Sequence, residues 1–251
     1  MPNYDRLTAL ACLAAVGLGC YLILELERWW LLPLCVAVGL GTWQVVKQHP
    51  GVPQVGRAVP FMFAPLPALL VLAAGLSLEP VLHRDWIIPG AVAVGIALWA
   101  TVAAEWYTVV LGRHTHAARL GLNLVTYLVA FGLYNTADEV GLGRLGSLAV
   151  AGLVTALLSV EVLRGSADDV GRTWLYAAVA GLVLAETRWG LDFLLLEGTL
   201  GAIFMVIAFH VVTGVMQSHF SRQLNAGTLA EFAAVAIVGL AIVFGVRFWI
   251  G

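Results

Sequence analysis

Long runs of apolar residues alternate with short polar breaks along almost the whole chain. A helix that crosses the hydrocarbon core of a bilayer needs about 20 mostly apolar residues, because every backbone polar group must be satisfied inside the segment. Nine runs fit this requirement: residues 7–24, 29–46, 60–78, 86–112, 117–134, 145–163, 173–185, 199–216 and 226–250. The seventh run is short and residues 186–197 after it are irregular, so eight to ten crossings remain open. The pattern predicts an all-α integral membrane protein, a bundle of about nine transmembrane helices with short loops.

Polar residues are distributed unevenly among these runs. The interiors of the first three runs contain almost none, whereas the later six place polar side chains mainly in one half of the predicted bundle. We therefore expect a single membrane domain that spans residues 1–251. It would combine an apolar three-helix part, residues 1–80, with a six-helix part, residues 86–251, whose cytoplasmic half is polar.

Prolines mark the start of the third run. Pro60, Pro65 and Pro67 indicate that this helix starts late or is broken, because proline lacks a backbone donor and disfavours helix in the residue before it. The polar segment ahead of it, residues 49–57, is either a re-entrant stretch or a proline-rich loop.

Composition requires the same apolar surroundings. Of 251 residues, 61% are hydrophobic and 11% are charged, whereas about 25% of residues are charged in ordinary soluble domains. The net charge of −2 offers no basic patch for nucleic acid, so membrane lipids are the expected partners. The 27 glycines suit close packing of helices, within the chain, in a homo-oligomer or in a larger membrane complex. The three cysteines lie in apolar runs, where packing is expected rather than a disulfide.

The basic residues indicate an orientation. With nine spans, eight of the 13 lysines and arginines fall on the N-terminal side of the membrane and the remaining five on the opposite side. Cytoplasmic loops carry an excess of basic residues. We therefore predict a multi-pass protein of the cell membrane with its N-terminus in the cytoplasm.

Glu105 and His210 are the clearest candidates for chemistry. An ionisable residue inside a span is costly, so it is a functional candidate by default. Glu105 lies seven residues before Gly112, which places it about 10 Å from that helix end. His210 lies at a comparable depth in the eighth run, with Thr213 on the same face. We expect the two side chains at similar heights, in a common hydrated pocket that opens to the cell interior.

Other polar residues of the six-helix part could complete such a site, whereas structural hydrogen bonding is the alternative for Glu105 and His210. The candidate binding residues are Glu105, His210, Asn123, Tyr127, Ser159, Tyr176, Thr213 and Glu231. Three residues near the ends of their helices are expected only to reach the headgroups: Glu161, Glu231 and Arg247. On the predicted outer face, Glu186 and Asp192 either guard an entrance and bind a cation, or belong to a solvated loop with a local ion pair.

No motif fixes a reaction. The chain contains no HExxH, GxSxG or phosphate-binding loop, and no ligand spacing predicts a metal site. No particular cofactor is indicated, and whether the protein is an enzyme remains open. Three hypotheses follow: a small-solute or proton/cation-coupled carrier or channel-like protein, a structural or accessory subunit of a larger membrane complex, and a membrane-embedded enzyme acting on a lipid or isoprenoid.

Overall fold

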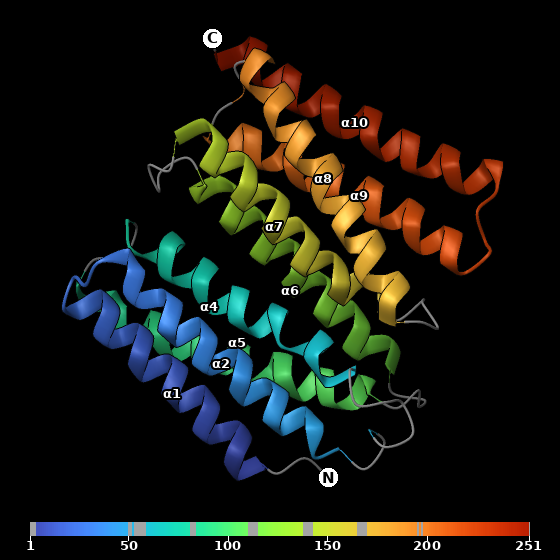
Figure 1. Ribbon diagram of the computed structural model, residues 1–251. Coiled ribbons are helices and arrows are strands. Elements are labelled where there is room, and N and C mark those ends of the chain that lie inside the picture. The colour runs from blue at the N-terminus through green and yellow to red at the C-terminus, as the bar shows by residue number, and fades with distance from the viewer. Residues whose placement is uncertain are drawn as a thin grey trace. The chain divides into compact units, whose positions relative to one another are not determined.

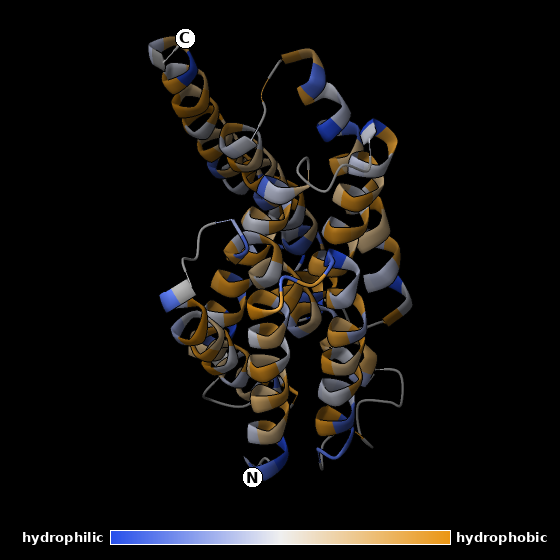
Figure 2. Cartoon of the chain, turned by 90° about the vertical axis from the view of Figure 1, so that its left-hand side faces the viewer, coloured by the Kyte–Doolittle hydropathy of each residue, from blue (hydrophilic) through white to orange (hydrophobic). Residues whose placement is uncertain are grey.

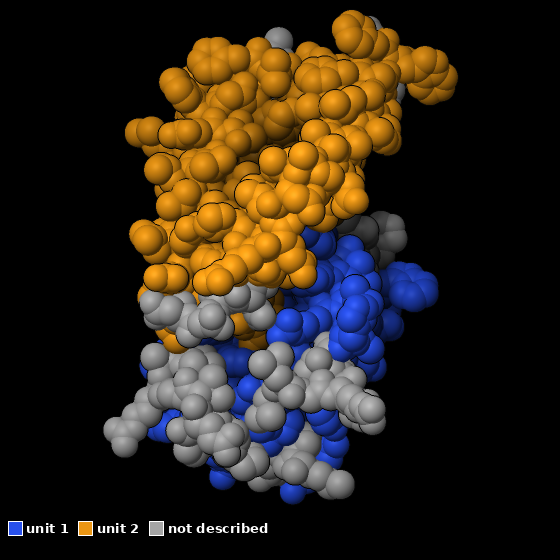
Figure 3. All heavy atoms as spheres, turned by 90° about the vertical axis from the view of Figure 1, so that its right-hand side faces the viewer, with its two compact units in different colours: residues 1–129 blue, residues 130–251 orange. Residues whose placement is uncertain are grey.

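The chain folds into α-helices joined by short connections (Figure 1). The computed structural model describes residues 4–49, 52, 59–80, 84–109, 115–137, 143–164, 170–194, 196 and 198–250. Every regular element in this part of the chain is helical. The helices gather in two compact units, residues 1–129 and 130–251, which are distinguished in Figure 3.

Where the structure describes it, the first unit contains four complete long helices and three short 3-10 turns. In chain order these are α1 (Tyr4–Ile23), η1 (Arg28–Trp30), α2 (Leu31–Lys47), η2 (Val59–Phe63), α4 (Pro65–Leu78), η3 (Arg84–Trp86) and α5 (Ile87–Thr108). The unit also includes the first part of α6 (Thr115–Thr136). Helix α4 begins at Pro65, where the missing backbone donor is harmless in a first turn. The prediction of a late start for this helix is therefore confirmed, whereas most of the segment 49–57 lies outside the described residues.

Small residues let the helices of this unit approach closely. Gly95 of α5 lies against α1: a Cβ added there would lie 2.9 Å from Ala15 Cβ and 3.2 Å from Ala11 O. Leu98 and Val102 of α5 are fully buried in the adjoining core. Close packing of this kind drives helix association where lipid tails are as apolar as the side chains.

The described residues of the second unit form the rest of α6 and four long helices, α7 (Gly143–Leu163), α8 (Val170–Leu194), α9 (Gly198–Phe220) and α10 (Ala226–Ile250). Helices α7 and α8 meet at Gly152 and Gly181, where a Cβ on Gly181 would lie 2.5 Å from Gly152 O. Helix α10 packs on α9, with the ring of Phe232 against Gly214.

Eight helical segments in the described part of the chain are long and apolar enough to cross a membrane. They are Tyr4–Ile23, Arg28–Lys47, Pro60–Leu78, Ile87–Thr108, His116–Thr136, Gly143–Leu163, Gly198–Phe220 and Ala226–Trp249. Many of their apolar side chains point outward, among them Val16, Ile96 and Ile237, and hydrophobic residues predominate along the helices in Figure 2. Such surfaces require lipid contact, so the predicted all-α membrane bundle is confirmed.

Helix α8 is longer than the sequence pattern predicts. The apolar run ends at Ala185 and an irregular stretch was expected beyond it, but the helix continues to Leu194. The hydroxyl of Thr187 donates to the carbonyl of Val183 (2.8 Å), and Arg188 lies 3.6 Å from Asp192 one turn later. Pairing at i and i+4 stabilises a helix whose surface is polar, so hydropathy alone misses this extension.

Candidate functional site

Glu105 is the most deeply buried carboxylate among the predicted site residues. It lies near the end of α5, and its side chain has 0% exposure. Thr101, one turn earlier on the same face, is also buried, and its hydroxyl donates to the carbonyl of Ala97 (2.8 Å). Thr108 donates its hydroxyl proton to the backbone carbonyl of Glu105 (2.8 Å). The face of α5 that carries Thr101 and Glu105 therefore turns toward protein rather than toward lipid.

Trp106 and the imidazole of His49 lie at the same end of α5 as Glu105. Trp106, which follows Glu105, is nearly buried in the apolar core, and its ring meets the His49 imidazole edge-on with ring centres 4.6 Å apart. Burial lowers the pKa of His49, which lies just beyond α2. The imidazole therefore stays largely neutral near pH 7.

Asn123 and Tyr127 belong to the part of α6 that falls in the first unit. Both are half-buried and, at i and i+4, they share one face of the helix. Between them, Thr126 is fully buried and donates its hydroxyl proton to the carbonyl of Leu122 (2.8 Å). Glu105, Asn123 and Tyr127 are thus the predicted site residues of this unit.

His210 and Thr213 occupy α9 in the second unit. The His210 imidazole is half-buried and meets the ring of Phe232 on α10 at 5.9 Å. Thr213 has 0% exposure, and its hydroxyl bonds to the carbonyl of Phe209 (2.7 Å). Since Glu105 and His210 lie in different units, their meeting in one hydrated pocket stays a prediction.

Ser159 and Glu161 lie at the buried end of α7. The Ser159 hydroxyl is fully enclosed and has no hydrogen-bond partner among the described residues. Glu161 forms an ion pair of 2.5 Å with Arg164, and the two side chains are only 4% and 10% exposed. Glu161 is therefore held inside the protein, whereas the sequence suggested that it reaches the headgroups. An i, i+3 spacing of opposite charges was the available signal for this pair.

The remaining predicted residues lie nearer the surface of the second unit. Tyr176 of α8 packs on Phe220 with ring centres 4.5 Å apart, whereas Glu186 and Glu231 are exposed. Asp192 contacts Arg144 of α7 at 2.7 Å in addition to Arg188 of its own helix. The predicted outer acidic group thus contains an ion-pair network that joins α7 to α8. A role for Glu186 and Asp192 in guarding an entrance or binding a cation stays a prediction.

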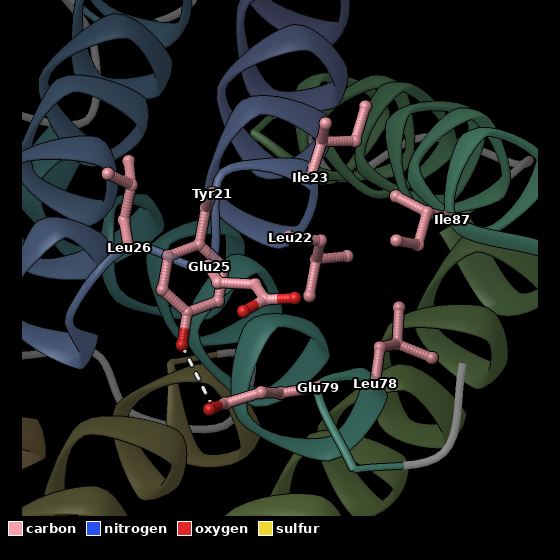
Figure 4. Close-up of a pocket in the computed structure, with 8 residues that line it drawn as sticks. All are labelled: Tyr21, Leu22, Ile23, Glu25, Leu26, Leu78, Glu79 and Ile87. Carbon is pink, nitrogen blue, oxygen red and sulfur yellow. Dashed lines mark hydrogen bonds between the residues drawn. The ribbon is translucent and has the colours of Figure 1, made fainter. Parts of the chain in front are cut away.

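The structure also forms a pocket that the sequence did not indicate. Its volume is about 430 Å³, and it lies at one end of the first unit (Figure 4). Three polar side chains line it, from Tyr21, Glu25 and Glu79. Its apolar walls are Leu22, Ile23, Leu26, Leu78 and Ile87. The residues come from α1, α4, α5 and the turns beside them, so only the tertiary fold brings them together.

No group of three or more His, Cys, Asp or Glu side chains in the described segments is arranged to hold a metal ion.

These features define the class of the protein, a multi-pass membrane protein built from an all-α bundle. More specifically, the chain belongs to a family of proteins of unknown function, DUF5656, whose family model matches residues 9–246. No curated protein and no solved structure matches the chain.

Proposed function

We propose that this protein is a small-solute or proton/cation-coupled carrier, or a channel-like protein, of the cell membrane, and that Glu105 exchanges the proton or cation. The observation that supports this proposal is the complete burial of the Glu105 side chain inside a membrane-spanning helix. Ionised carboxylates at such positions are costly, and they typically mark ion pathways or proton relays. The N-terminus would face the cytoplasm, in accord with the distribution of basic residues.

The chemistry of this role follows from the two states of a carboxyl group. A protonated Glu105 carries no charge and suits its enclosed position, whereas the ionised form requires a cation or a hydrogen-bonding environment. Exchange between these states would couple the loading of a proton or cation to a change in helix packing. In this proposal, His210 is a second candidate for proton exchange, because an imidazole changes charge near neutral pH.

Proton flux into proteoliposomes tests the proposal. The wild type, Glu105→Gln and the matched control Glu27→Gln are reconstituted with a pH-sensitive dye inside the vesicles, and a potassium diffusion potential drives the flux. Glu27 is an exposed carboxylate outside the spans. We expect Glu105→Gln to lower the flux at least tenfold and Glu27→Gln to leave it unchanged.

Each variant is first checked by size-exclusion chromatography. A wild-type flux no greater than that of empty vesicles, for protons and for sodium or potassium ions, would contradict the proposal. So would a correctly folded Glu105→Gln variant with full flux. A role as an accessory subunit and a role as a membrane-embedded enzyme stay alternative hypotheses. Co-purification of partner chains in mild detergent tests the first, and lipid turnover by the purified protein tests the second.

A further inference from the structure

Two carboxylates, those of Glu25 and Glu79, line the pocket at the end of the first unit. Glu79 accepts a hydrogen bond from the Tyr21 hydroxyl (2.9 Å) and another from Arg28 Nε (3.2 Å). Glu25 makes no ion pair or side-chain hydrogen bond within the described part of the chain. Among the described residues, Arg28 therefore pairs with Glu79 and leaves the Glu25 carboxylate at the pocket without an opposite charge. The negative charge of Glu25 favours a cationic ligand.

The backbone holds Glu25 in place at the pocket. Helix α1 ends in a turn in which the N–H of Leu26 bonds to the carbonyl of Tyr21 (3.2 Å), and Glu25 takes a φ of +48°. Glycine is the usual residue at this position of such a turn, because other side chains are disfavoured there. In Figure 4 the Glu25 carboxylate is drawn between the Tyr21 ring and Leu22, with the Glu79 carboxylate below it at the Tyr21 hydroxyl.

The walls of the pocket are apolar and come from the ends of membrane spans. Leu22 and Ile87 are 8% exposed and form its inner surface, whereas Ile23 is open to the surroundings of the helix. A ligand that fills the pocket must therefore be amphipathic, with a cationic group at the carboxylates and a hydrocarbon part along the leucine and isoleucine side chains.

Tryptophans place this end of the unit at the level of the lipid headgroups. Trp29 and Trp30 of η1 follow the lining residue Leu26 closely in the chain, and Trp86 of η3 directly precedes Ile87. All three are at least 60% exposed. Exposed indoles at the ends of spans are typical of the membrane interface. A lipid whose headgroup ends in an amine presents a cationic group and a hydrocarbon chain together at this level.

We propose that the pocket binds a membrane lipid with a primary ammonium headgroup. The ammonium lies between the carboxylates of Glu25 and Glu79, and the first carbons of an acyl chain run along Leu22, Leu78 and Ile87. A primary ammonium supplies three N–H donors to the carboxylates, whereas a quaternary ammonium supplies none. The site therefore selects ethanolamine over choline headgroups. This inference is independent of the role proposed for Glu105.

Lipid retention tests the site. The full-length protein is purified in detergent, equilibrated with equal amounts of phosphatidylethanolamine and phosphatidylcholine, and the retained lipids are counted by native mass spectrometry. We expect the wild type to retain the ethanolamine lipid at least fivefold over the choline lipid. Glu27→Gln should keep this preference, because Glu27 does not line the pocket. Glu25→Gln should abolish it.

A second variant tests the apolar part of the pocket separately from the contact between the carboxylates and the headgroup. Leu78→Trp fills the apolar part, so we expect it to lower the retention of the ethanolamine lipid while Glu25 and Glu79 remain. Equal retention of the two lipids by the wild type would overturn the proposal, as would a preference that survives Glu25→Gln. Binding of octylamine or calcium that depends on Glu25, without lipid preference, would also overturn it and would assign the pocket to a soluble amine or a metal ion.

Discussion

The hydroxyl of Tyr21 on α1 donates a hydrogen bond of 2.9 Å to Glu79, the residue that follows α4. Tyr21 itself is 3% exposed, so its ring is packed in the core while its hydroxyl reaches the pocket. The bond joins two helices that are separated in the sequence by α2. It also fixes the orientation of the Glu79 carboxylate at the pocket. A single polar contact therefore contributes both to the packing of the unit and to the proposed lipid site.

Replacing Tyr21 by phenylalanine removes this bond and keeps the packing of the ring. We expect Tyr21→Phe to lower the free energy of unfolding by about 1 kcal/mol, the usual net value of one hydrogen bond. Tyr107→Phe is the matched control, because the Tyr107 side chain is 51% exposed and its hydroxyl lies 3.4 Å from that of Tyr4. Unfolding in mixed micelles of increasing denaturing-detergent content measures both. Equal effects of the two variants would contradict the importance of the Tyr21–Glu79 bond.

Gly181 permits the closest approach of α7 and α8. A Cβ at this position would lie 2.5 Å from Gly152 O and 2.9 Å from Ala156 Cβ, so the backbones must move apart. We expect Gly181→Ala to destabilise the protein by about 1–3 kcal/mol, as overpacking does. Gly190→Ala, in the same helix but with nothing within 4 Å of the added Cβ, should be neutral or slightly stabilising. Thermal unfolding in detergent compares them, and equal midpoints would show that the crossing tolerates a methyl group.

Tyr134 and Thr155 form a buried hydroxyl pair between α6 and α7, with the two oxygens 2.6 Å apart. Thr155 donates its own proton to the carbonyl of Ala151 (2.7 Å), so the Tyr134 hydroxyl acts as the donor to Thr155. Thr155→Val leaves a buried tyrosine donor without this acceptor and should cost about 1–3 kcal/mol. Tyr134→Phe leaves the bond from Thr155 to Ala151 in place and should cost about 1 kcal/mol. The same unfolding assay ranks the two variants, and the reverse order would contradict the assigned donor.

The helices were largely predictable from the sequence because each apolar run determines its own secondary structure, whatever its neighbours in the fold are. A run of apolar residues must form hydrogen bonds within itself in lipid, so the runs that include Leu18, Leu98 and Phe209 all became helices. The prolines at the start of α4 also acted locally, through the missing donor of Pro65. Helix α8 extended beyond its apolar run because paired charges, which hydropathy counts only as polar, stabilise its last turns.

The sites were less predictable because they depend on how distant segments meet. Thr101 and Thr108 lie at i−4 and i+3 from Glu105, a spacing that predicts an inward polar face, and the full burial of Glu105 agrees with it. Nothing in the sequence joined Glu25 to Glu79, since their proximity arises from the packing of α1 against α4. The predicted partnership of Glu105 with His210 is of the same long-range kind, and it stays a prediction.

Glu25 and Arg222 occupy equivalent positions after α1 and α9, with φ values of +48° and +53°. In each turn the following N–H bonds back to the helix, from Leu26 to Tyr21 O (3.2 Å) and from Gln223 to Ser218 O (3.0 Å). We expect Glu25→Gly and Arg222→Gly each to stabilise the protein by about 1 kcal/mol, because glycine adopts this conformation without a Cβ penalty. Glu25→Ala should give no such gain. Thermal midpoints in detergent check this order, and a matching gain from alanine would show that the backbone is not the cause.

His49 should make stability depend on pH. Burial lowers the pKa of its imidazole in the folded protein, so the unfolded chain, with a pKa of about 6.5, takes up the proton first. The stability that depends on a neutral His49 imidazole is therefore fully present above about pH 6.5, and it is lost as the pH falls toward the lower folded-state pKa. Comparing unfolding midpoints at pH 7.5 and 5.5, we expect His49→Phe, which keeps an aromatic ring against Trp106, to lose less stability in acid than the wild type. His116→Phe, an exposed position of α6, should behave like the wild type. An undiminished acid loss in His49→Phe would show that another group carries the pH dependence.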